Sequence, residues 1–383
     1  MTRRGAAVLT ALVTSALCAL SLGNLLYLYI ALLLGLVLLY SFITCLWARH
    51  TAACHQHLSA RTVHRGGSAY LVAQAYHACP LPISPLRGQY VWAGQEGECA
   101  FPAAPFKSAT RRVPLSARHV GRFDAFITAL WIRDLFGLFQ MKKKPNTSGA
   151  VLTVLPRPFD IEKPHFTLGD EGSTALGRTQ EDYNAPEDVR AYRPGDAMKR
   201  IHWKLSSRKR ELLVRRFETP APPDTLILLD CDTPLGGENV PEGKESLRDA
   251  LCETAVAVAR LQMEDGSPVR LPIYGKKANE FASDQADGLS LLQEMLAAQP
   301  FGGGEDFAKV LHLELRRMRR TGATVIITTR LDAQIVEAVS HIRRMGPSAR
   351  LYLVTYSPEG PAYQPYVARL QHQLVEVCYV TPA

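Results

Sequence analysis

Two long apolar runs at the amino terminus constrain the fold of this chain more than any other feature. The first covers residues 6–22, the second covers residues 25–47, and neither contains a charged residue. A run of about 20 apolar residues is long enough to cross the hydrocarbon core of a bilayer as a helix. Gly23 and Asn24 between the runs indicate a tight turn. We therefore expect residues 1–48 to form a transmembrane helical hairpin.

The first run has an alternative interpretation, a cleaved signal peptide. A second apolar run follows at once and no small-residue cleavage pattern precedes it, which favours two spans. Basic residues flank the pair at both ends: Arg3, Arg4, Arg49, Arg61 and Arg65. Because segments rich in Lys and Arg stay on the cytoplasmic side, both ends are expected there. The chain is predicted to be a multi-pass protein of the cell membrane with cytoplasmic soluble domains.

The length, charge and cysteine content of the chain indicate how many folded units it has, which partners suit it and in which compartment it lies. A chain of 383 residues predicts two or three folded units, and its net charge of +8 is concentrated around residue 200. No motif for binding RNA or DNA is present, so nucleic acid is not expected as a partner, and anionic lipid or an acidic protein is favoured. The eight cysteines are scattered, without a C-x-x-C pair, as expected in a reducing compartment.

Residues 49–160 have the composition of a β-rich domain. Strand-like segments alternate with turns that contain many prolines and glycines. The clearest of these strands are expected at residues 68–77, 89–93, 111–115 and 150–155. We expect this domain to be a β-sandwich.

Residues 161–223 form a linker with an unusual charge distribution, acidic at first and densely basic from Lys199 onward. Pro194 fixes φ, Gly195 can take a positive φ, and Asp196 suits a helix N-cap. A short helix should follow, with an apolar face made of Met198, Ile201 and Leu205. Residues 212–217 then have the pattern of a strand.

Residues 224–383 show a regular alternation of strands and helices. Strands are expected at 225–230, 269–274, 324–329, 351–356 and 375–380. Helices are expected at 245–263, 289–298, 307–320, 333–344 and 363–373. Such alternation predicts a parallel sheet with helices on both faces, a doubly wound α/β domain.

Four stretches of this chain resemble those of a known family. R-x-Y-x-x-G-D-x-x-x-x-I-H-W-K-x-S-S-R begins at Arg190, and E-L-L-V-R-x-F-E begins at Glu211. Together they resemble the signature of the bacterial "domain of unknown function fifty-eight" family. R-D-L-F-G-L-F from Arg133 and V-L-P-R-P from Val154 resemble two further family stretches, with Leu135 where proline is usual.

The resemblance implies a membrane anchor, a β-rich segment and a C-terminal domain similar to von Willebrand factor type A domains. It also implies two partners, a MoxR-type AAA+ ATPase and a transglutaminase-like membrane protein. No reaction is established for the family. The expected fold is thus a two-helix transmembrane hairpin, then a β-sandwich, then a von Willebrand factor type A-like α/β domain.

Type A domains often bind Mg²⁺ through a D-x-S-x-S motif after the first strand. The corresponding residues here begin with Asp230, and Asp232 and Pro234 replace the two serines. Residues 302–306 lack the expected threonine, and Arg330 follows a later strand, where its charge would repel a divalent cation. Phosphate-binding loops and hydrolase motifs are also missing from the sequence. We expect a degenerate metal site, no cofactor and no catalytic residue.

The signature segment supplies the candidate binding residues, and two interpretations of it stay open. The candidates are Arg190, Tyr192, Arg193, Gly195, Asp196, Arg200, Trp203, Lys204, Arg208 and Arg215. They could form a docking surface for an acidic partner, with Trp203 and Tyr192 as aromatic anchors. They could instead join the two soluble domains, with arginines paired to Glu187, Asp188 and Asp196. For Trp203 and Ile201 we expect a place in the core.

The function predicted from these observations is that of a non-enzymatic adaptor or scaffold, anchored in the membrane and facing the cytoplasm. The resemblance implies that it acts with a MoxR-type AAA+ ATPase in assembly or maturation of envelope complexes. The alternative is a metal-assisted hydrolase that uses Asp230 and Asp232.

Overall fold

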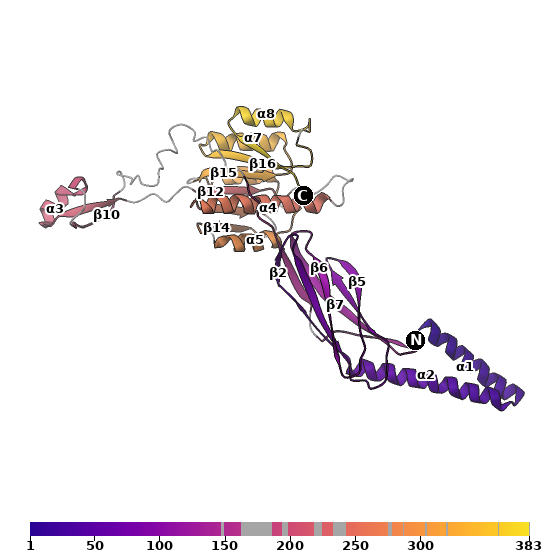
Figure 1. Cartoon of the computed structure of the whole chain (residues 1–383). Coiled ribbons are helices and arrows are strands. Elements are labelled where there is room, and N and C mark those ends of the chain that lie inside the picture. The colour runs from indigo at the N-terminus through magenta and orange to yellow at the C-terminus, as the bar shows by residue number, and fades with distance from the viewer. Residues whose placement is uncertain are drawn as a thin grey trace. The chain divides into compact units, whose positions relative to one another are not determined.

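The computed structural model describes residues 1–146, 149–161, 186–193, 198–217, 224–232, 243–274, 278–285, 287–302, 305–318, 321–358 and 360–382. The chain forms two compact units (Figure 1). The first consists of Met1–Pro156 with Leu296–Ala298, and the second of Arg157–Met295 with Gln299–Ala383.

Two long apolar helices begin the chain, as predicted. Helix α1 spans Arg3–Leu22 and helix α2 spans Leu25–Thr51, and both are long and apolar enough to cross a membrane. Gly23, with a φ of 62°, ends α1, and the Asn24 side chain accepts a hydrogen bond from the Leu26 N–H to begin α2. The turn chemistry that the sequence predicted therefore operates at both residues.

Helix α2 is longer than a bilayer core requires, and its last turns belong to the soluble domain. Its 27 residues extend about 40 Å, against roughly 30 Å for the hydrocarbon core. Cys45, Ala48 and Ala52 are buried in the same core as the strands that follow. The helix therefore continues directly from the apolar hairpin into the β-rich domain.

The β-rich domain consists of two sheets around one core. The first sheet contains β1 (Ala53–Leu58), β3 (Ser68–Tyr76) and β6 (Ser108–Ser116), in that order. The second has the order β2 (Thr62–His64), β9 (Ala150–Leu155), β7 (Gly121–Arg133), β4 (Leu86–Trp92) and β5 (Gln95–Phe101), with β8 (Gln140–Lys143) paired to β7. Strand β3 alternates buried and exposed residues, so that Leu71 and Ala73 meet Ile127 and Leu152 of the other sheet in one cluster.

The second unit contains a six-stranded sheet. Its order is β14 (Asn279–Ser283), β13 (Val269–Ile273), β12 (Asp224–Leu229), β15 (Thr321–Thr328), β16 (Ser348–Val354) and β17 (Glu376–Val380). Five strands run parallel, and β14 pairs antiparallel to β13 at the edge. The predicted all-parallel sheet is therefore wrong at this edge, because the segment 279–283 returns as a hairpin strand.

Helices cover both faces of this sheet. Leu226 and Leu228 of β12 pack in one cluster with α6 (Phe307–Leu315), α7 (Ala333–Arg344) and α8 (Gln364–His372). The alternate residues Ile227 and Leu229 are buried on the opposite face. Helix α4 (Gly243–Glu264) contacts β12, β13, β15 and β16. Helix α5 (Gly288–Ala298) comes before α6 in the chain. The helix–sheet–helix arrangement is that of an α/β domain.

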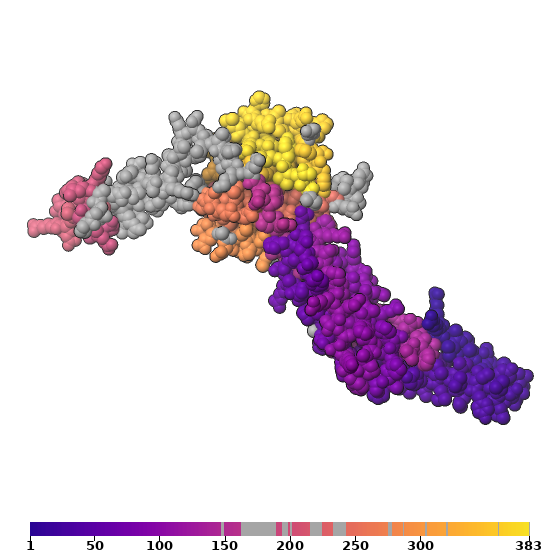
Figure 2. All heavy atoms as spheres, viewed as in Figure 1, coloured from indigo at the N-terminus to yellow at the C-terminus, as the bar shows by residue number. Residues whose placement is uncertain are grey.

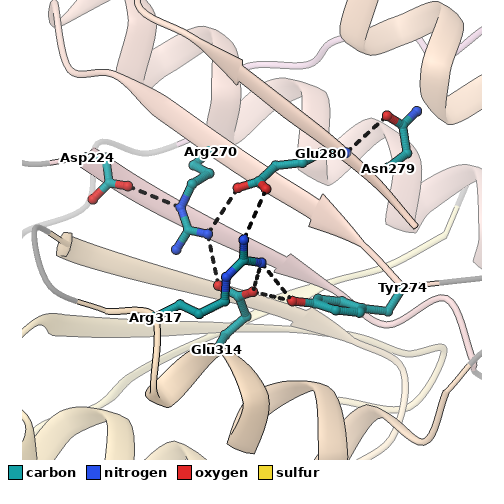
Figure 3. Close-up of polar contacts among 7 residues, drawn as sticks. All are labelled: Asp224, Arg270, Tyr274, Asn279, Glu280, Glu314 and Arg317. Atoms are coloured by element: carbon teal, nitrogen blue, oxygen red, sulfur yellow. Dashed lines mark hydrogen bonds and ion pairs between the residues drawn. The ribbon is translucent and has the colours of Figure 1, made fainter.

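A buried ion-pair network fixes the β13–β14 edge to helix α6 (Figure 3). The Glu314 carboxylate is fully buried and pairs with Arg270 at 2.9 Å and with Arg317 at 3.0 Å. Arg270 also pairs with Asp224 at 3.2 Å and with Glu280 at 3.1 Å. Tyr274 donates a hydrogen bond to Glu314. Arg270 of β13 thus links its own strand to the neighbouring strands β12 and β14 and to helix α6.

The signature segment forms a separate small structure, which we call the basic hairpin (residues 186–217). It contains β10 (Pro186–Ala191), a 3₁₀ turn η2 (Met198–Arg200), α3 (Trp203–Lys209) and β11 (Leu213–Phe217). Strands β10 and β11 pair antiparallel, and Ile201 forms a bridge with Val214. The predicted single helix through Met198 and Leu205 is therefore wrong. Ile201 joins the strands instead, and the His202 ring begins a new helix by accepting from the Leu205 N–H at 3.2 Å.

Candidate functional site

The first candidate site lies at the carboxyl ends of the parallel strands. Strand β12 has β13 on one side and β15 on the other, so the direction of strand addition reverses there. In open α/β sheets, ligands bind outside the carboxyl ends of the strands at such a switch point. Asp230 directly follows β12, Thr328 ends β15, and Arg330 lies two residues later. The predicted degenerate site is thus located where this fold places ligand sites.

Arg330 lies between the two aspartates of this edge. Its Nε is 3.2 Å from Asp230 Oδ2, and its Nη2 is 3.1 Å from Asp232 Oδ2. The fully buried Asp230 carboxylate also accepts a hydrogen bond from the Thr328 hydroxyl at 2.8 Å and another from the Asp232 N–H at 3.2 Å. Asp306, which caps helix α6, lies 4.0 Å from Arg330 Nη2. One guanidinium therefore offsets part of the negative charge of the carboxylates at this edge.

The electrostatics agree with this geometry. Burial alone would lower the pKa of Arg330, but its ion pairs with Asp230 and Asp232 raise the pKa above the ordinary value. Burial, together with the neighbouring Asp230 charge, raises the pKa of Cys231 to about 12, so this thiol stays protonated at neutral pH. The edge thus carries a permanent internal cation and no thiolate nucleophile at Cys231.

The residues at this edge do not fit a divalent cation as they stand. Mg²⁺ and Ca²⁺ require about six oxygen ligands, and a guanidinium in contact with the same carboxylates opposes a second positive charge by Coulomb repulsion. Across the described ranges, no three His, Cys, Asp or Glu side chains are grouped as a metal site. The chemistry this arrangement can perform is structural ion pairing or the recognition of a charged surface.

The second candidate site is the basic hairpin, which has a small core of its own. Ile201, Leu213 and Val214 are buried. The buried Ser206 hydroxyl accepts a hydrogen bond from the Leu213 N–H at 2.9 Å, and the His202 N–H donates to the Leu213 carbonyl at 2.8 Å. These contacts hold α3 against β11. Ile201 therefore has the core position that the sequence predicted.

The outer surface of α3 is basic and aromatic. Trp203 is 62% exposed and Met198 is 69% exposed. Five cations of the same stretch are also exposed: Lys199, Lys204, Arg208, Lys209 and Arg210. Trp203 is therefore not part of the hairpin's own core, which Ile201, Leu213 and Val214 fill. Its predicted structural role in packing between the domains stays a prediction. A solvent-facing tryptophan favours the docking interpretation of this segment.

The other predicted residues of the signature segment are distributed along the hairpin. Arg190 and Arg193 are exposed near the end of β10, and Tyr192 is half-buried with its N–H bound to the Leu212 carbonyl at 2.8 Å. Gly195 and Asp196 lie outside the described residues, and so do the side chains of Glu187, Asp188, Arg200 and Arg215. The predicted arginine–carboxylate pairs of this segment stay predictions.

Two residues of the strand-end site were not predicted from the sequence as members of it. Thr328 binds Asp230 directly, and Asp306 approaches Arg330 from the start of α6. Thr328 could have been found, since it ends the strand that neighbours β12 in a parallel sheet, and such ends meet at one edge. Asp306 ends the segment 302–306, which the family resemblance had already assigned to this edge as a loop without the expected threonine.

Comparison with known proteins assigns a family to part of the chain. Residues 188–348 match the family described as "Protein of unknown function DUF58". The chain carries a DUF58 domain. The matched residues begin in β10 and end at the first residue of β16, so they include both candidate sites. The family resemblance of the signature segment is thereby confirmed, and the motif that begins at Arg133 lies outside the matched residues.

Individual relatives are distant. The "Uncharacterized protein YeaD" of Bacillus subtilis (strain 168) is 21% identical over 189 residues, which are 49% of this chain and 44% of that protein. This DUF58 chain thus matches less than half the length of that relative. Matches to solved structures were also found, among them the following two. Cwp6 from Clostridium difficile has 10% identity and a TM-score of 0.15 over 86% of this chain and 53% of its own. A Parabacteroides merdae β-glucuronidase has 7% identity and a TM-score of 0.18 over 85% and 38%. Neither score indicates a shared fold.

Proposed function

We propose that this DUF58 protein is a membrane-anchored adaptor that performs no reaction of its own. The observation that carries the proposal is the surface of the basic hairpin, where Trp203 and Met198 are exposed among lysines and arginines. Tryptophan and arginine are the residues most enriched in protein–protein hot spots. The excess of cations favours a partner with an acidic surface, since complementary charge steers association and selects partners.

The anchor of the adaptor is the α1–α2 hairpin. Basic residues lie at both ends of the pair, with Arg3 and Arg4 at the start of α1 and Arg49 near the end of α2. Positive charge on both sides of a helical hairpin supports a cytoplasmic location for both ends. The β-rich domain, the basic hairpin and the α/β domain then all face the cytoplasm.

The family resemblance supports the choice of partners and process. We propose a MoxR-type AAA+ ATPase as the acidic partner and a transglutaminase-like membrane protein as a neighbour in the bilayer. The α/β domain acts as a von Willebrand factor type A-like scaffold in this proposal. The assembly would serve the construction or maturation of envelope complexes.

A binding experiment with the full chain in nanodiscs tests the proposal. The probe is the purified MoxR-type AAA+ ATPase encoded by the same genome, presented with ATP or ADP. We expect Trp203→Ala to weaken binding by about 30-fold or more, the effect of losing a hot spot worth at least about 2 kcal/mol. The melting temperature should not change, because Trp203 is mostly exposed.

Matched controls separate docking from folding. Tyr379→Ala removes an aromatic side chain that is 42% exposed on β17 and should leave binding intact. Arg344→Glu reverses an exposed charge on α7, and Lys204→Glu reverses one on α3. Only Lys204→Glu should weaken the association. A Trp203→Ala protein that binds like the parent, or a parent that binds the ATPase in neither nucleotide state, would refute the proposal.

The alternative function, a metal-assisted hydrolase, uses Asp230 and Asp232. It requires both carboxylates to exchange Arg330 for a metal ion, although Arg330 contacts them at 3.2 Å and 3.1 Å. The adaptor proposal requires no rearrangement of this edge. It is therefore the function that the geometry supports best.

A further inference from the structure

The turn between β7 and β8, residues 134–139, has a structural role that the adaptor function does not use. The Asp134 carboxylate at its start is fully buried. Its Oδ1 accepts a hydrogen bond from the Phe139 N–H at 2.6 Å, and its Oδ2 accepts from the Phe136 N–H at 3.0 Å. The same Oδ2 accepts from the Ser41 hydroxyl of α2 at 2.8 Å. One carboxylate thus shapes the turn and ties it to the longer apolar helix.

The other apolar helix is held by the same turn. The Thr2 hydroxyl, at the N-cap of α1, donates to the Gly137 carbonyl at 2.6 Å, and the Thr2 N–H donates to the Leu138 carbonyl at 2.9 Å. A Cβ on Gly5 would lie 2.3 Å from the Leu138 oxygen, so glycine permits this close approach. Figure 2 shows magenta atoms of this part of the chain directly against the indigo helices.

These contacts indicate the depth at which the turn would lie in a bilayer. Because Thr2 and Ser41 bind the same turn, Arg3 and Arg4 lie near the level of Ser41. Both arginines are exposed, and a charged side chain is costly in the hydrocarbon core. The boundary of the hydrocarbon therefore passes close to the turn.

The tip of the turn is apolar and exposed at that level. Leu135 and Phe136 are each 50% exposed. The Phe136 ring packs edge-on against Tyr40, with centroids 6.4 Å apart, and Leu39 next to Tyr40 is 55% exposed. Tyr40 precedes Ser41 in α2, on the side of the proposed membrane. The turn therefore adds its own apolar side chains to the apolar outer surface of α2 at this level. Lipid, rather than water, is the solvent that suits this surface.

Basic residues lie on the other side of the boundary. Arg49 is eight residues past Ser41, about 12 Å farther along α2. Lys143 donates to the His50 carbonyl at 3.1 Å, and the Lys142 Nζ lies 5.5 Å from the centroid of the Trp131 ring. Burial and the nearby Arg49 charge both lower the pKa of Lys143, so Arg49 and Lys143 lie near one another. Such a band is within reach of phosphate headgroups, since long basic side chains extend toward the interface.

We propose that Leu135 and Phe136 form a wedge inserted into the bilayer, and that Arg49, Lys142 and Lys143 form a band that binds anionic phospholipid headgroups. This inference rests on the proposed membrane anchoring of α1 and α2. It assigns the β-rich domain a lipid-binding face of its own. The α1–α2 hairpin and the wedge would fix the domain against the membrane surface at several points rather than through a single flexible connection.

Photocrosslinking of the full chain in proteoliposomes tests the wedge. A benzophenone-bearing phenylalanine replaces Phe136, Leu32 or Tyr70, and lipid adducts are identified by mass spectrometry after illumination. Leu32 is 63% exposed on α2, and Tyr70 is 41% exposed on β3, opposite Pro114 and away from the α2 end of the domain. We expect lipid adducts at positions 136 and 32 and none at position 70.

The outcomes separate the wedge from the anchor. Adducts at 32 without adducts at 136 would overturn the wedge and leave the anchor standing. Adducts at 136 to another copy of the chain instead of lipid would overturn the wedge as well. An absence of adducts at both positions would refute the proposed anchoring itself.

Lipid identity tests the basic band in the same preparation. The vesicles contain equal amounts of phosphatidylcholine and phosphatidylglycerol, and the probe stays at position 136. We expect adducts to phosphatidylglycerol to exceed those to phosphatidylcholine, and the excess to disappear in Lys142→Gln/Lys143→Gln. Arg112→Gln/Arg118→Gln, which removes two exposed cations from β6 and the loop after it, should keep the excess. Equal adducts in the parent would overturn headgroup binding by this band.

Discussion

Replacing Arg330 with alanine tests how the strand-end edge is held together. The change removes the cation that contacts Asp230 and Asp232, while Asp230 itself stays fully buried. The Asp230 carboxylate keeps its hydrogen bonds from the Thr328 hydroxyl and the Asp232 N–H. The variant therefore loses charge compensation without losing every polar contact.

The expected loss of stability lies between two limits. Removing one partner of a fully buried ion pair costs about 3–5 kcal/mol, and a surface pair contributes about 0–1 kcal/mol. The Arg330 side chain is 29% exposed and the Asp230 side chain is fully buried, so solvent screens the pair in part. The hydrogen bonds that remain lower the cost further. We expect a loss of about 2 kcal/mol.

Hydrogen exchange read by mass spectrometry is the assay that fits this part of the chain. The four tryptophans are Trp47, Trp92, Trp131 and Trp203, so fluorescence does not report on residues 224–383. Amides of β12 and β15 flank the ion pair, and their exchange follows the free energy of opening. A loss of about 2 kcal/mol should accelerate their exchange about 30-fold.

A second variant identifies the cause. Adding Asp230→Asn to Arg330→Ala removes the buried charge and should restore much of the protection, whereas Arg344→Ala on α7 should change nothing. Exchange in β12 that stays at the parent rate in Arg330→Ala would refute the ion-pair argument. Equal acceleration in the single and double variants would attribute the effect to lost packing instead.

The same variant tests the metal-dependent alternative. Once Arg330 is gone, oxygens of Asp230, Asp232, Thr328 and Asp306 surround the vacated position. We expect Mn²⁺ to slow exchange in β12 of Arg330→Ala and to have no effect on the parent protein. Protection of the parent by Mn²⁺ that disappears on Asp230→Ala would support the hydrolase alternative.

Three further predictions concern buried polar groups outside this edge. Arg270→Met should destabilise the α/β domain by about 3 kcal/mol, because the fully buried Glu314 loses the partner that lies 2.9 Å away. The measurement is hydrogen exchange of the amides in β13. Adding Glu314→Met should restore most of their protection. Asp134→Ala should lower the melting temperature of the β-rich domain, because two N–H groups of the turn lose their hydrogen-bond acceptor, which costs about 1–3 kcal/mol of stability for each. The melt is followed by tryptophan fluorescence with the full chain in nanodiscs. Asp124→Ala on β7 is the control. Burial lowers the pKa of His77, and the nearby backbone of Ala103 opposes this only in part. The unfolded chain therefore binds a proton that the folded one excludes, so the stability of the β-rich domain should fall as the pH drops below about 6.5, and His77→Leu should flatten that dependence.

The helices of the α/β domain were predictable because local signals agree with the packing. Residues 333–344 form α7 as expected, with an Asp332 side chain that accepts from the Ile335 N–H and with Ile335, Val336 and Val339 buried. Cap and apolar periodicity lie within one short segment, so the sequence contains the whole argument. The strands β12 and β16 were found for a related reason, since strands buried on both faces are nearly continuous apolar runs.

The strands of the β-rich domain were less predictable. Strand β1 contains Gln56 between two histidines, and strand β5 contains three polar or charged residues in its first four positions. Gln56 is tolerated because its side-chain oxygen accepts from the Ile127 N–H at 2.6 Å, where β7 is irregular. That partner is far away in the sequence, so composition could not predict the strand. β14 was missed likewise, because Asn279 and Glu280 are exposed on a sheet edge.

The position of Trp203 could not be predicted from its neighbours. An aromatic residue among cations is compatible with a packed core and with a binding surface, and periodicity does not separate the two. The outcome depends on which residues fill the hairpin. Ile201 turns inward because it bridges to Val214, which places Trp203 at the start of a separate helix with its side chain outward.

The placement of charge connects the two proposed surfaces. The described arginines of the α/β interior are used within the fold, since Arg270 and Arg330 both contact buried carboxylates. The exposed cations on α3 and beside the end of α2 instead lie next to exposed aromatic or aliphatic side chains. Buried ion pairs contribute little net stability but fix geometry, whereas exposed cations beside apolar groups can bind acidic surfaces and headgroups. If this division is correct, reversing charges on α3 should affect protein binding alone, and neutralising Lys142 and Lys143 should affect lipid preference alone. A single variant that abolishes both would show that the two surfaces are not independent.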